Sequence, residues 1–588
     1  MTLFASKRPR SDFNPGDDLQ TSAAAVRIDG VRARALETGR TRLFAASLVF
    51  LTAFSGIGLR MVDVAVLGHT AQPPKSGGGA EAVGADMARA DIVDRNGVIL
   101  ATSLPTVSLY AKTSELLDTA DAAEKLATVF PDIDVEETQA RLSSSRSFVY
   151  LMRNLTPRQQ YDVNALGIPG FYFEKGERRA YPHGSLASHV VGMTDVDNKG
   201  LSGVEREFNS RLLSDHHPLR LSLDIRMQTI VHNELAKAIS DFNAIGGVGL
   251  IMDVKTAEVL AMVSEPDFDP ADPPPATDTR MFNRATKGLY EMGSTFKLFN
   301  TAAAIDFGTA NVNSTYDATQ PLHIYGSTIH DDHPENRWLS VAEILIHSSN
   351  IGASRMAMDL GITNQRAFLN RVGLLSPLPI ELPEVSAPLI PNPWREINSI
   401  TISFGHGISV TPLHLISGVG SLVNGGSYRP PTLLARDEND LPPAQQIEKA
   451  KTSADLRMLM REVVESGTGK LADVPGYDVG GKTGTAEKAG VGGYRRKAVL
   501  ASFIAAFPID NPRYAVLVMV DEPQGNTQSH GFITGGWVAA PAVQRIIAAI
   551  APLTGIEPRL EPQAQAPRPA SPKGLANDNR SRDIAAAQ

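Results

Sequence analysis

Apolar and polar residues recur from residue 222 onwards with the periods of helices and strands. After Ser222-Leu223-Asp224, apolar side chains return about every 3.6 residues, which predicts a helix. Four apolar runs favour strands, at residues 249–253, 258–264, 498–507 and 514–520. A last helical pattern covers residues 536–550. Strands near both ends with helical patterns between them predict one sheet flanked by helices.

Glycine positions refine this outline. Residues 89–101 alternate around Asn96-Gly97, a pair typical of the tight turn of a β-hairpin. The run Gly246-Gly247-Val248-Gly249 has the glycine content of a nucleotide-binding loop. Such a loop follows a strand and begins a helix, whereas this run leads into a predicted strand. The pattern therefore argues against dinucleotide binding.

An uncharged run of 17 residues covers residues 43–59, and its apolar character resumes after Arg60 and Asp63 as far as residue 67. This length suffices for one membrane-spanning helix. Residues 1–42 carry a net charge of +3, which leaves −11 for the rest of a chain whose total is −8. The positive-inside rule then predicts a cytoplasmic N-terminus. A cleaved signal peptide is the alternative, but no small-x-small cleavage site follows the run closely.

Length and composition set further bounds. A chain of 588 residues implies two or more domains. Cysteine is absent, so disulfides, thiolate metal sites and a cysteine nucleophile are excluded. The body is modestly acidic without a long basic run, which gives no support for nucleic-acid binding. Beyond residue 554 the chain is rich in Pro, Ala and Gln, a composition typical of disorder.

Three strings of reactive residues follow one another along the chain: Ser294-Thr295-Phe296-Lys297, Ser348-Ser349-Asn350 and Lys482-Thr483-Gly484-Thr485. Each string alone is weak evidence, because strings this short arise by chance. Their order is more specific, with 54 residues from Ser294 to Ser348 and 134 from Ser348 to Lys482.

The first string can supply an activated nucleophile. A serine hydroxyl needs a base near neutral pH. Gly293 before Ser294 and apolar residues after it place Ser294 at a helix N-terminus, with Lys297 one turn further on the same face. Lys297 acts as a base only if burial or a nearby positive charge, which Lys482 could supply, lowers its pKa. By itself, the string is more typical of a surface Ser and Lys on a helix, and the two later strings reverse this interpretation.

The other two strings can supply a proton relay and an anion site. Residues 340–343 form a capping-box pattern, so a short helix over 341–347 breaks at Ser348 and leaves Ser348 and Asn350 on a turn. A simple capping turn is the alternative. Residues 479–486 fit an edge strand on which Gly484 permits close approach of an extended peptide. A hairpin turn is the alternative there.

The order and spacing of the strings resemble those of the penicillin-recognising serine acyltransferases, which include penicillin-binding proteins and serine β-lactamases. Within that group the chain is similar to class B penicillin-binding proteins of the cell-division type over roughly residues 40–550. The match to their non-catalytic pedestal domain rests on residues 89–101, Arg179-Ala180-Tyr181-Pro182 and residues 200–205. Ala90 stands where the family usually has glycine. Met292 stands where many relatives carry proline, which we expect to alter affinity for individual β-lactams without loss of catalysis.

The resemblance implies an α/β fold, an α+β sandwich with an antiparallel sheet flanked by helices. A pedestal domain and one N-terminal transmembrane helix precede this catalytic domain. The expected parts are a cytoplasmic tail at 1–42, a transmembrane anchor at 43–67, a flexible tether at 68–84, the pedestal at 85–220, the transpeptidase domain at 221–552 and a disordered tail at 555–588. Arg95 and Glu205 are expected to form buried ion pairs that brace the pedestal, and Thr411 is expected to cap a helix that begins at Pro412.

The resemblance also assigns roles. Ser294 is the nucleophile, Lys297 the base and Ser348 the proton relay. Asn350, Lys482, Thr483, Gly484 and Thr485 bind substrate, and the N–H groups of Ser294 and Thr485 form the oxyanion hole. No cofactor and no metal are implied, because the segment His330-Asp331-Asp332-His333 is interpreted as a polar loop.

The implied activity is that of a peptidoglycan D,D-transpeptidase, which cross-links stem peptides of the septal wall and is acylated by β-lactams. The alternatives are an elongation-type transpeptidase, a D,D-carboxypeptidase or β-lactamase, and a non-catalytic β-lactam sensor. The implied partners are a polytopic glycan polymerase and other membrane proteins of the division machinery. The implied location is the inner membrane at the septum, with the catalytic domain in the periplasm.

Overall fold

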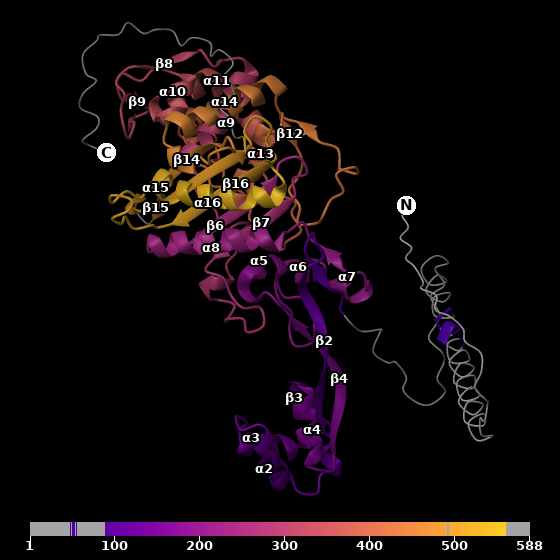
Figure 1. Cartoon of the computed structure of the whole chain (residues 1–588). Helices are drawn as coiled ribbons and strands as arrows, with labels where there is room; N and C mark the ends of the chain where they lie inside the picture. Colours follow the sequence, from indigo (N-terminus) through magenta and orange to yellow (C-terminus); the bar gives the residue numbers. More distant parts are fainter. Residues whose placement is uncertain (1–47, 49, 53, 56–88, 491–492, 560–588) are drawn as a thin grey trace, which may run out of the picture. The chain divides into compact units, whose positions relative to one another are not determined.

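The computed structural model describes residues 48, 50–52, 54–55, 89–490 and 493–559, with side chains described up to residue 488 and again from residue 498 (Figure 1). The chain divides into two units, residues 1–83 and 84–588. In the first unit the described residues are helical, and Leu48, Phe50, Leu51 and Phe54 are each more than 60% exposed. The rest of the predicted span, the cytoplasmic tail and most of the tether lie outside the described residues.

The second unit contains two separate five-stranded sheets. The first has the order β3-β2-β1-β5, with β4 paired to β2. Its strands are β1 Ile92–Val93, β2 Ile99–Ala111, β3 Val149–Leu155, β4 Phe171–Ala180 and β5 Leu219–Arg220. The strands β1 and β2 pair antiparallel around Asn96-Gly97, so the predicted hairpin is confirmed. The helices α2 Thr119–Val129, α3 Val135–Leu142 and α4 Pro157–Ala165 enclose a small core with β2 and β3.

A buried ion network stabilises this module. It includes a residue of α6 Gly203–Glu207, the second of three short helices that follow β4, between α5 Ser188–Val191 and α7 Asn209–Ser214. Glu205 on α6 is fully buried and accepts hydrogen bonds from Arg89 Nε and Arg179 Nε, each at 2.6 Å. The expected buried pairing of Glu205 is therefore present, but Arg95 has no part in it. Arg95 lies 3.7 Å from Glu258 of the next sheet and is partly exposed.

The second sheet is antiparallel throughout and has the order β14-β15-β16-β6-β7. Its strands are β6 Gly246–Asp253, β7 Val259–Glu265, β14 Gly480–Gly490, β15 Gly493–Phe507 and β16 Tyr514–Asp521. All four predicted strands are confirmed. Every residue of β6 is buried, because helices cover both faces of the sheet.

Helices form a layer on each face of this sheet (Figure 1). On one face, α8 Ile225–Asp241 and α16 Ala540–Ile550 pack against each other and against the strands. On the other face lies α13 Pro412–Val423, and beyond it α9 Lys297–Phe307, α11 Asn350–Arg371 and α14 Ala450–Ser466. Asp224 caps α8. Thr411 caps α13, with Pro412 in its first turn, as expected from the resemblance. The α+β sandwich expected from the sequence is present.

The remaining elements connect these layers. The helices are α10 Val341–Ile346, α12 Glu396–Ile402 and α15 Gly535–Val538. The short strands are β8 Thr315–Asp317, β9 Leu322–Ile324, β10 Ser327–Ile329, β11 Trp338–Ser340, β12 Ser427–Tyr428 and β13 Gln445–Gln446.

Two features of the C-terminal part qualify sequence-based expectations. The stretch Gly535–Thr554 is long and apolar enough to cross a membrane, but half of it is buried and it belongs to the core against the sheet. Residues 555–559 belong to the predicted disordered tail, yet they lie on the body. Arg559 donates from its backbone N–H to Gly476 O at 2.8 Å and pairs with Asp478 at 2.8 Å. The rest of the tail lies outside the described residues.

Candidate active site

Ser294 lies on a 3-10 turn, Gly293–Phe296, that leads directly into α9. The sequence predicted a helix N-terminus, and the first turn is the tighter 3-10 form. Gly293 has a φ of +54°, and a Cβ there would lie 2.7 Å from the carbonyl oxygen of Thr485. Only glycine satisfies both conditions, so the turn that carries Ser294 can lie against strand β14.

Lys297 is fully buried beneath Ser294. Its Nζ lies 2.8 Å from Ser294 Oγ and 2.7 Å from Asn350 Oδ1. The same nitrogen lies 2.9 Å from the carbonyl oxygen of Ser348 and 3.3 Å from Ser348 Oγ. The first two predicted strings therefore meet at one amine, which is within proton-transfer distance of two hydroxyl groups.

Ser348 occupies a turn between α10 and α11. The capping box of Ser340 and Glu343 begins α10 as predicted, and His347 ends it. Ser348 then adopts a φ of +59°, which residues other than glycine rarely do, and Ser349 caps α11. This backbone reversal directs both the carbonyl and the hydroxyl of Ser348 towards Lys297.

Lys482 enters the site from β14, which is the edge strand of the sheet as predicted. Its Nζ lies 3.1 Å from Ser348 Oγ and 3.1 Å from Thr483 Oγ1. The hydroxyl of Ser348 is consequently in contact with both lysines. Thr483 Oγ1 also lies 2.8 Å from Thr468 Oγ1, and Thr485 Oγ1 accepts a hydrogen bond from Gly535 N at 3.1 Å. Thr468 and Gly535 carry no sequence signal that would have singled them out.

Burial determines the charge of the two lysines. It lowers the pKa of Lys297 to about 7, against the opposing effect of the Asp331 and Asp332 carboxylates. Burial also lowers the pKa of Lys482 well below its usual range, and the charge of Lys297 adds to this effect. Burial or the charge of Lys482 was the predicted cause of a lowered pKa for Lys297, and desolvation by burial is the dominant one. Lys297 is thus neutral in a large fraction of molecules near pH 7.

Packing within the protein gives a further reason for glycine at position 484, beside the predicted close approach of a peptide. A Cβ at this position would lie 2.4 Å from Ser502 Oγ and 2.9 Å from the carbonyl oxygen of Met292. The close neighbours are therefore groups of the protein itself, on β15 and beside the nucleophile turn. Glycine at this position keeps β14 in contact with the turn that carries Ser294.

The segment at 330–333 contains a residue that sequence reasoning missed. It was interpreted as a polar loop, but Asp331 within it is only 9% exposed. Its carboxylate contacts the start of α11, and the His330 carbonyl accepts a hydrogen bond from Asn350 Nδ2 at 3.1 Å. Asp331 precedes Ser349 by 18 residues, and no local pattern links such positions.

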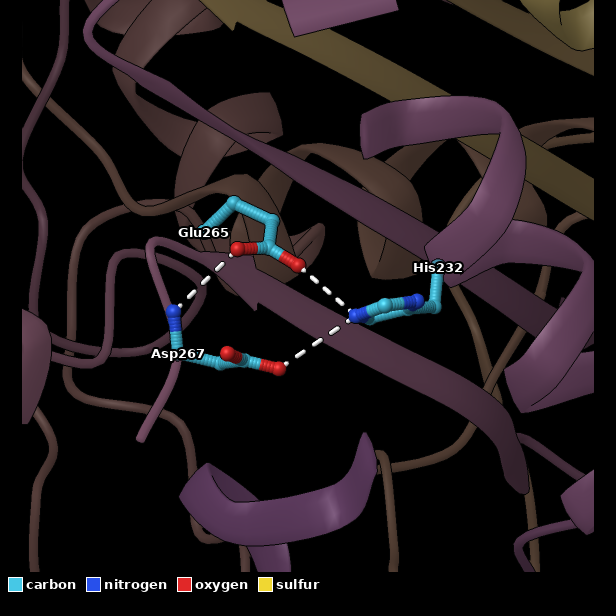
Figure 2. Close-up of side chains that lie close together, drawn as sticks. All are labelled: His232, Glu265 and Asp267. Carbon is cyan, nitrogen blue, oxygen red and sulfur yellow. Dashed lines mark hydrogen bonds and ion pairs between the residues drawn. The ribbon is translucent and has the colours of Figure 1, made fainter. Parts of the chain in front are cut away.

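One group of side chains in the described chain resembles a metal-ligand set. The ligand atoms of His232 on α8, Glu265 at the end of β7 and Asp267 lie within 4.8 Å of one another. Figure 2 shows His232 Nε2 between the two carboxylates, at 3.0 Å from Glu265 Oε1 and 3.3 Å from Asp267 Oδ2. Hydrogen bonding to Asp267 and Glu265 raises the pKa of His232 to about 10. At neutral pH the imidazole is therefore protonated, and this arrangement acts as an ion triad.

The main cluster combines the requirements of acyl transfer. A partly exposed hydroxyl lies beside a buried amine, which is neutral in part of the molecules. A second hydroxyl and a second buried lysine follow within hydrogen-bond distance. The amine can remove the proton of Ser294, and Ser348 can move a proton between the two lysines and a leaving group. The edge of β14 is free to pair with an extended peptide beside them.

Comparisons with known proteins agree with this chemistry. The penicillin-binding protein transpeptidase domain matches residues 247–547, and the penicillin-binding protein dimerisation domain matches residues 85–216. The chain is 38% identical over 557 residues to a probable peptidoglycan D,D-transpeptidase FtsI of Caulobacter vibrioides, covering 92% of this chain and 93% of that protein. It is 34% identical over 504 residues to a probable peptidoglycan D,D-transpeptidase PenA of Neisseria gonorrhoeae, covering 80% and 85%.

A solved structure shares the fold. The crystal structure of penicillin-binding protein 3 from Mycobacterium tuberculosis, complexed with aztreonam, aligns with a TM-score of 0.64 and 24% sequence identity. The alignment covers 80% of this chain and 97% of that chain. The two proteins therefore share both the pedestal module and the sandwich.

Proposed function

The chain belongs to the penicillin-binding protein transpeptidase family, in its class B architecture, and we propose that it is a peptidoglycan D,D-transpeptidase of the cell-division type. The observation that carries this proposal is the continuous set of contacts from Ser294 through Lys297 and Ser348 to Lys482, at 2.8, 3.3 and 3.1 Å. A buried lysine with a pKa of about 7 supports a serine that is activated for acyl transfer, and product analysis separates a transpeptidase from a β-lactam sensor, which would use the same base for its acylation.

The proposed first half-reaction makes an ester. Ser294 Oγ attacks the carbonyl carbon of the penultimate D-Ala of a stem peptide, and its proton moves to Lys297 Nζ. The N–H groups of Ser294 and Thr485 stabilise the oxyanion. As the C–N bond breaks, the departing D-Ala amine takes a proton through Ser348. Ser294 is then acylated and Lys297 is neutral again.

The second half-reaction transfers the acyl group to an amine of a neighbouring stem peptide. The amine attacks the ester carbonyl, loses a proton through the same relay, and Ser294 leaves as the alcohol. One peptide bond is broken in the first half-reaction and one is formed in the second, so no external energy source is needed. A β-lactam imitates the D-Ala-D-Ala end and stops after the first half-reaction, because its acyl-enzyme is hydrolysed slowly.

Substrate binding is assigned to the groups around this relay. Lys482, Thr483 and Thr485 hold the terminal carboxylate, and the edge of β14 beside Gly484 pairs with the peptide backbone. Asn350 Oδ1 accepts a hydrogen bond from Lys297 Nζ, and Asn350 Nδ2 donates one hydrogen to the His330 carbonyl. An amide nitrogen carries two hydrogens, so the second remains for a substrate carbonyl.

We further propose a single membrane anchor at residues 43–67, with a cytoplasmic N-terminus and a periplasmic body at the division septum. The support is the length of the apolar run, the +3 charge of residues 1–42 and the exposure of the apolar side chains described within the run. We propose that this body consists of a pedestal at 85–220 and a transpeptidase domain at 221–552. A polytopic glycan polymerase and other division proteins are the proposed partners.

Acylation of Ser294 tests the proposed nucleophile. The full-length protein in detergent should be labelled by a fluorescent penicillin, and mass spectrometry should find the adduct on Ser294. Ser294→Ala should abolish labelling and keep the thermal unfolding midpoint, because a partly exposed hydroxyl contributes little to the core. An adduct on another residue would refute the assignment.

Product analysis separates the proposed activity from its alternatives. With a lipid-linked pentapeptide donor and an acceptor stem, a transpeptidase yields cross-linked dimer with release of D-Ala. A D,D-carboxypeptidase releases D-Ala and yields only shortened monomer. A β-lactam sensor yields neither product, although it is labelled by penicillin. Cross-linked dimer that disappears in Ser294→Ala is the expected result.

A further inference from the structure

Asp331 is an acidic residue that is buried beside the candidate active site and that the mechanism above does not use. It lies on the loop between β10 and β11 and is 9% exposed. Among the described residues, no side-chain nitrogen of a lysine, arginine or histidine forms a salt bridge with its carboxylate oxygens within 4.0 Å. A buried carboxylate is retained only where other groups satisfy it.

Three groups at the start of α11 satisfy this carboxylate. Its Oδ1 accepts the backbone N–H groups of Asn350 at 2.5 Å and of Ile351 at 2.9 Å. Its Oδ2 accepts the hydroxyl of Ser349 at 2.7 Å. Ser349 Oγ in turn accepts the N–H of Gly352 at 2.9 Å. The free N–H groups of the first helical turn are therefore bound by Asp331, directly or through Ser349.

This cap determines where the catalytic turn lies. Ser348 immediately precedes the capped residues and holds an unfavourable φ of +59°, which persists only when neighbouring contacts impose it. Three of the four polar contacts of Lys297 Nζ come from this turn, namely Ser348 O, Ser348 Oγ and Asn350 Oδ1. A shift of the first turn of α11 would therefore move most partners of the base.

The charge of Asp331 also acts on Lys297. The charged groups that face Lys297 are Lys482 on β14 and the carboxylates of Asp331 and Asp332 on the loop. Asp331 is the larger of the two acidic effects, and unlike Asp332 it is shielded from solvent. Solvent screening weakens the field of an exposed charge much more than that of a buried one.

We propose that Asp331 is a positioning residue of the acyl transfer, whose carboxylate holds the Ser348–Asn350 turn against Lys297 and balances part of the positive charge that Lys297 carries when it is protonated. The inference rests on the proposed function, because the turn and the lysine pair are the groups that the reaction uses. It adds a residue that contacts neither the substrate nor the reacting atoms.

Asp331→Asn separates these effects with a nearly isosteric change. The amide Oδ1 can still accept from Asn350 and Ile351, but the charge is gone and Nδ2 cannot accept the Ser349 hydroxyl. The measurement is the second-order rate of acylation by a fluorescent penicillin, on full-length protein, between roughly pH 5.5 and 9. We expect the plateau to fall about tenfold or more, the usual effect of a misplaced catalytic group.

The acidic side of the same pH profile, its acid limb, reports whether the charge of Asp331 affects the pKa of Lys297. Loss of a nearby carboxylate lowers the pKa of a lysine, so the limb should move to lower pH by about half a unit. Asp332→Asn removes the same charge at an exposed position and should move the limb clearly less. Ser349→Ala keeps the charge and removes one contact, so it should lower the plateau and leave the limb in place.

The outcomes distinguish the two proposals. If Asp331→Asn folds and keeps the wild-type plateau and limb, Asp331 has no positioning role. A lowered plateau with an unmoved limb would overturn charge balancing, and a moved limb with an unchanged plateau would overturn the placement of the turn. Should Asp331→Asn fail to fold, Ser349→Ala decides the placement. Failure of the wild type to acylate Ser294 would instead refute the proposed function.

Discussion

At the scale of single residues, the proposed base is the most informative group. Lys297 is fully buried, and burial lowers its pKa to about 7. A lysine that is permanently charged cannot accept the proton of a serine hydroxyl, so it cannot activate that serine as a nucleophile. The proposed reaction therefore depends on an amine that is neutral in part of the molecules. Burial away from water lowers the pKa of the lysine enough for this.

Replacement of this lysine by arginine tests that dependence. Lys297→Arg keeps the positive charge but cannot release it, so acylation by penicillin should fall by about a hundredfold, the usual scale of lost general-base help. The measurement is the acylation rate at neutral pH. Lys488→Arg is a matched control, since Lys488 lies on β14 and pairs with Asp521 at 2.8 Å, outside the relay. Near wild-type acylation of Lys297→Arg would mean that another group takes the proton.

At the scale of elements, the ion triad of Figure 2 joins α8 to the end of β7. The folded-state pKa of His232 is about 10, above the ordinary value of 6.5. A raised pKa means that the folded state holds the proton more tightly than the unfolded state. The stabilisation by this triad is therefore fully present below pH 6.5 and is lost as pH rises through about 10.

His232→Gln should show this pH dependence. The variant should unfold at lower temperature than the wild type near pH 6, and the difference should shrink as pH approaches about 10. Thermal unfolding of both proteins across that range is the measurement. His217→Gln is the control, because His217 pairs with Asp215 but is 91% exposed. A difference that stays constant with pH would show that His232 acts by packing and not by charge.

The elements of the active site illustrate how far local pattern extends. The capping box at Ser340 and the strand around Lys482 were predictable from residues within a few positions, and the cap at Thr411 was implied by the family resemblance. The packing reason for Gly484 was not predictable, because its close neighbours are Ser502 and Met292 from other parts of the chain. Pairing between distant segments leaves no periodic signal in either one.

At the scale of the whole molecule, the membrane run should do more than hold the enzyme near its lipid-linked substrate. A protein beginning near residue 68 is expected to bind penicillin in solution but fail to support division, because it keeps the active site and loses a partner surface. Complementation of a depleted strain, with septal localisation of a fluorescent fusion, is the measurement.

A chimaera provides the converse test. Replacing residues 43–67 with an unrelated span of equal length keeps the anchor and removes its sequence. We expect the chimaera to insert and to be labelled by penicillin, yet to divide cells poorly. Normal division by the chimaera would show that the run is only a tether.

The sequence by itself predicted one sheet flanked by helices, four of its strands, the three strings of reactive residues and the resemblance to class B transpeptidases. These follow from periodicity and short motifs, which depend on neighbouring residues and so can be read along the chain. Spacing within one helical turn places Ser294 and Lys297 on the same face, and their proposed roles as nucleophile and base come from the family resemblance.

Only the tertiary structure decided the environments of the charged groups. Glu205 pairs with Arg89 and Arg179 and not with Arg95, Asp331 caps α11, and burial rather than Lys482 dominates the pKa of Lys297. Desolvation and Coulombic interaction depend on which distant segments surround a group in space. Distances of that kind arise from folding, and no local pattern in the chain contains them.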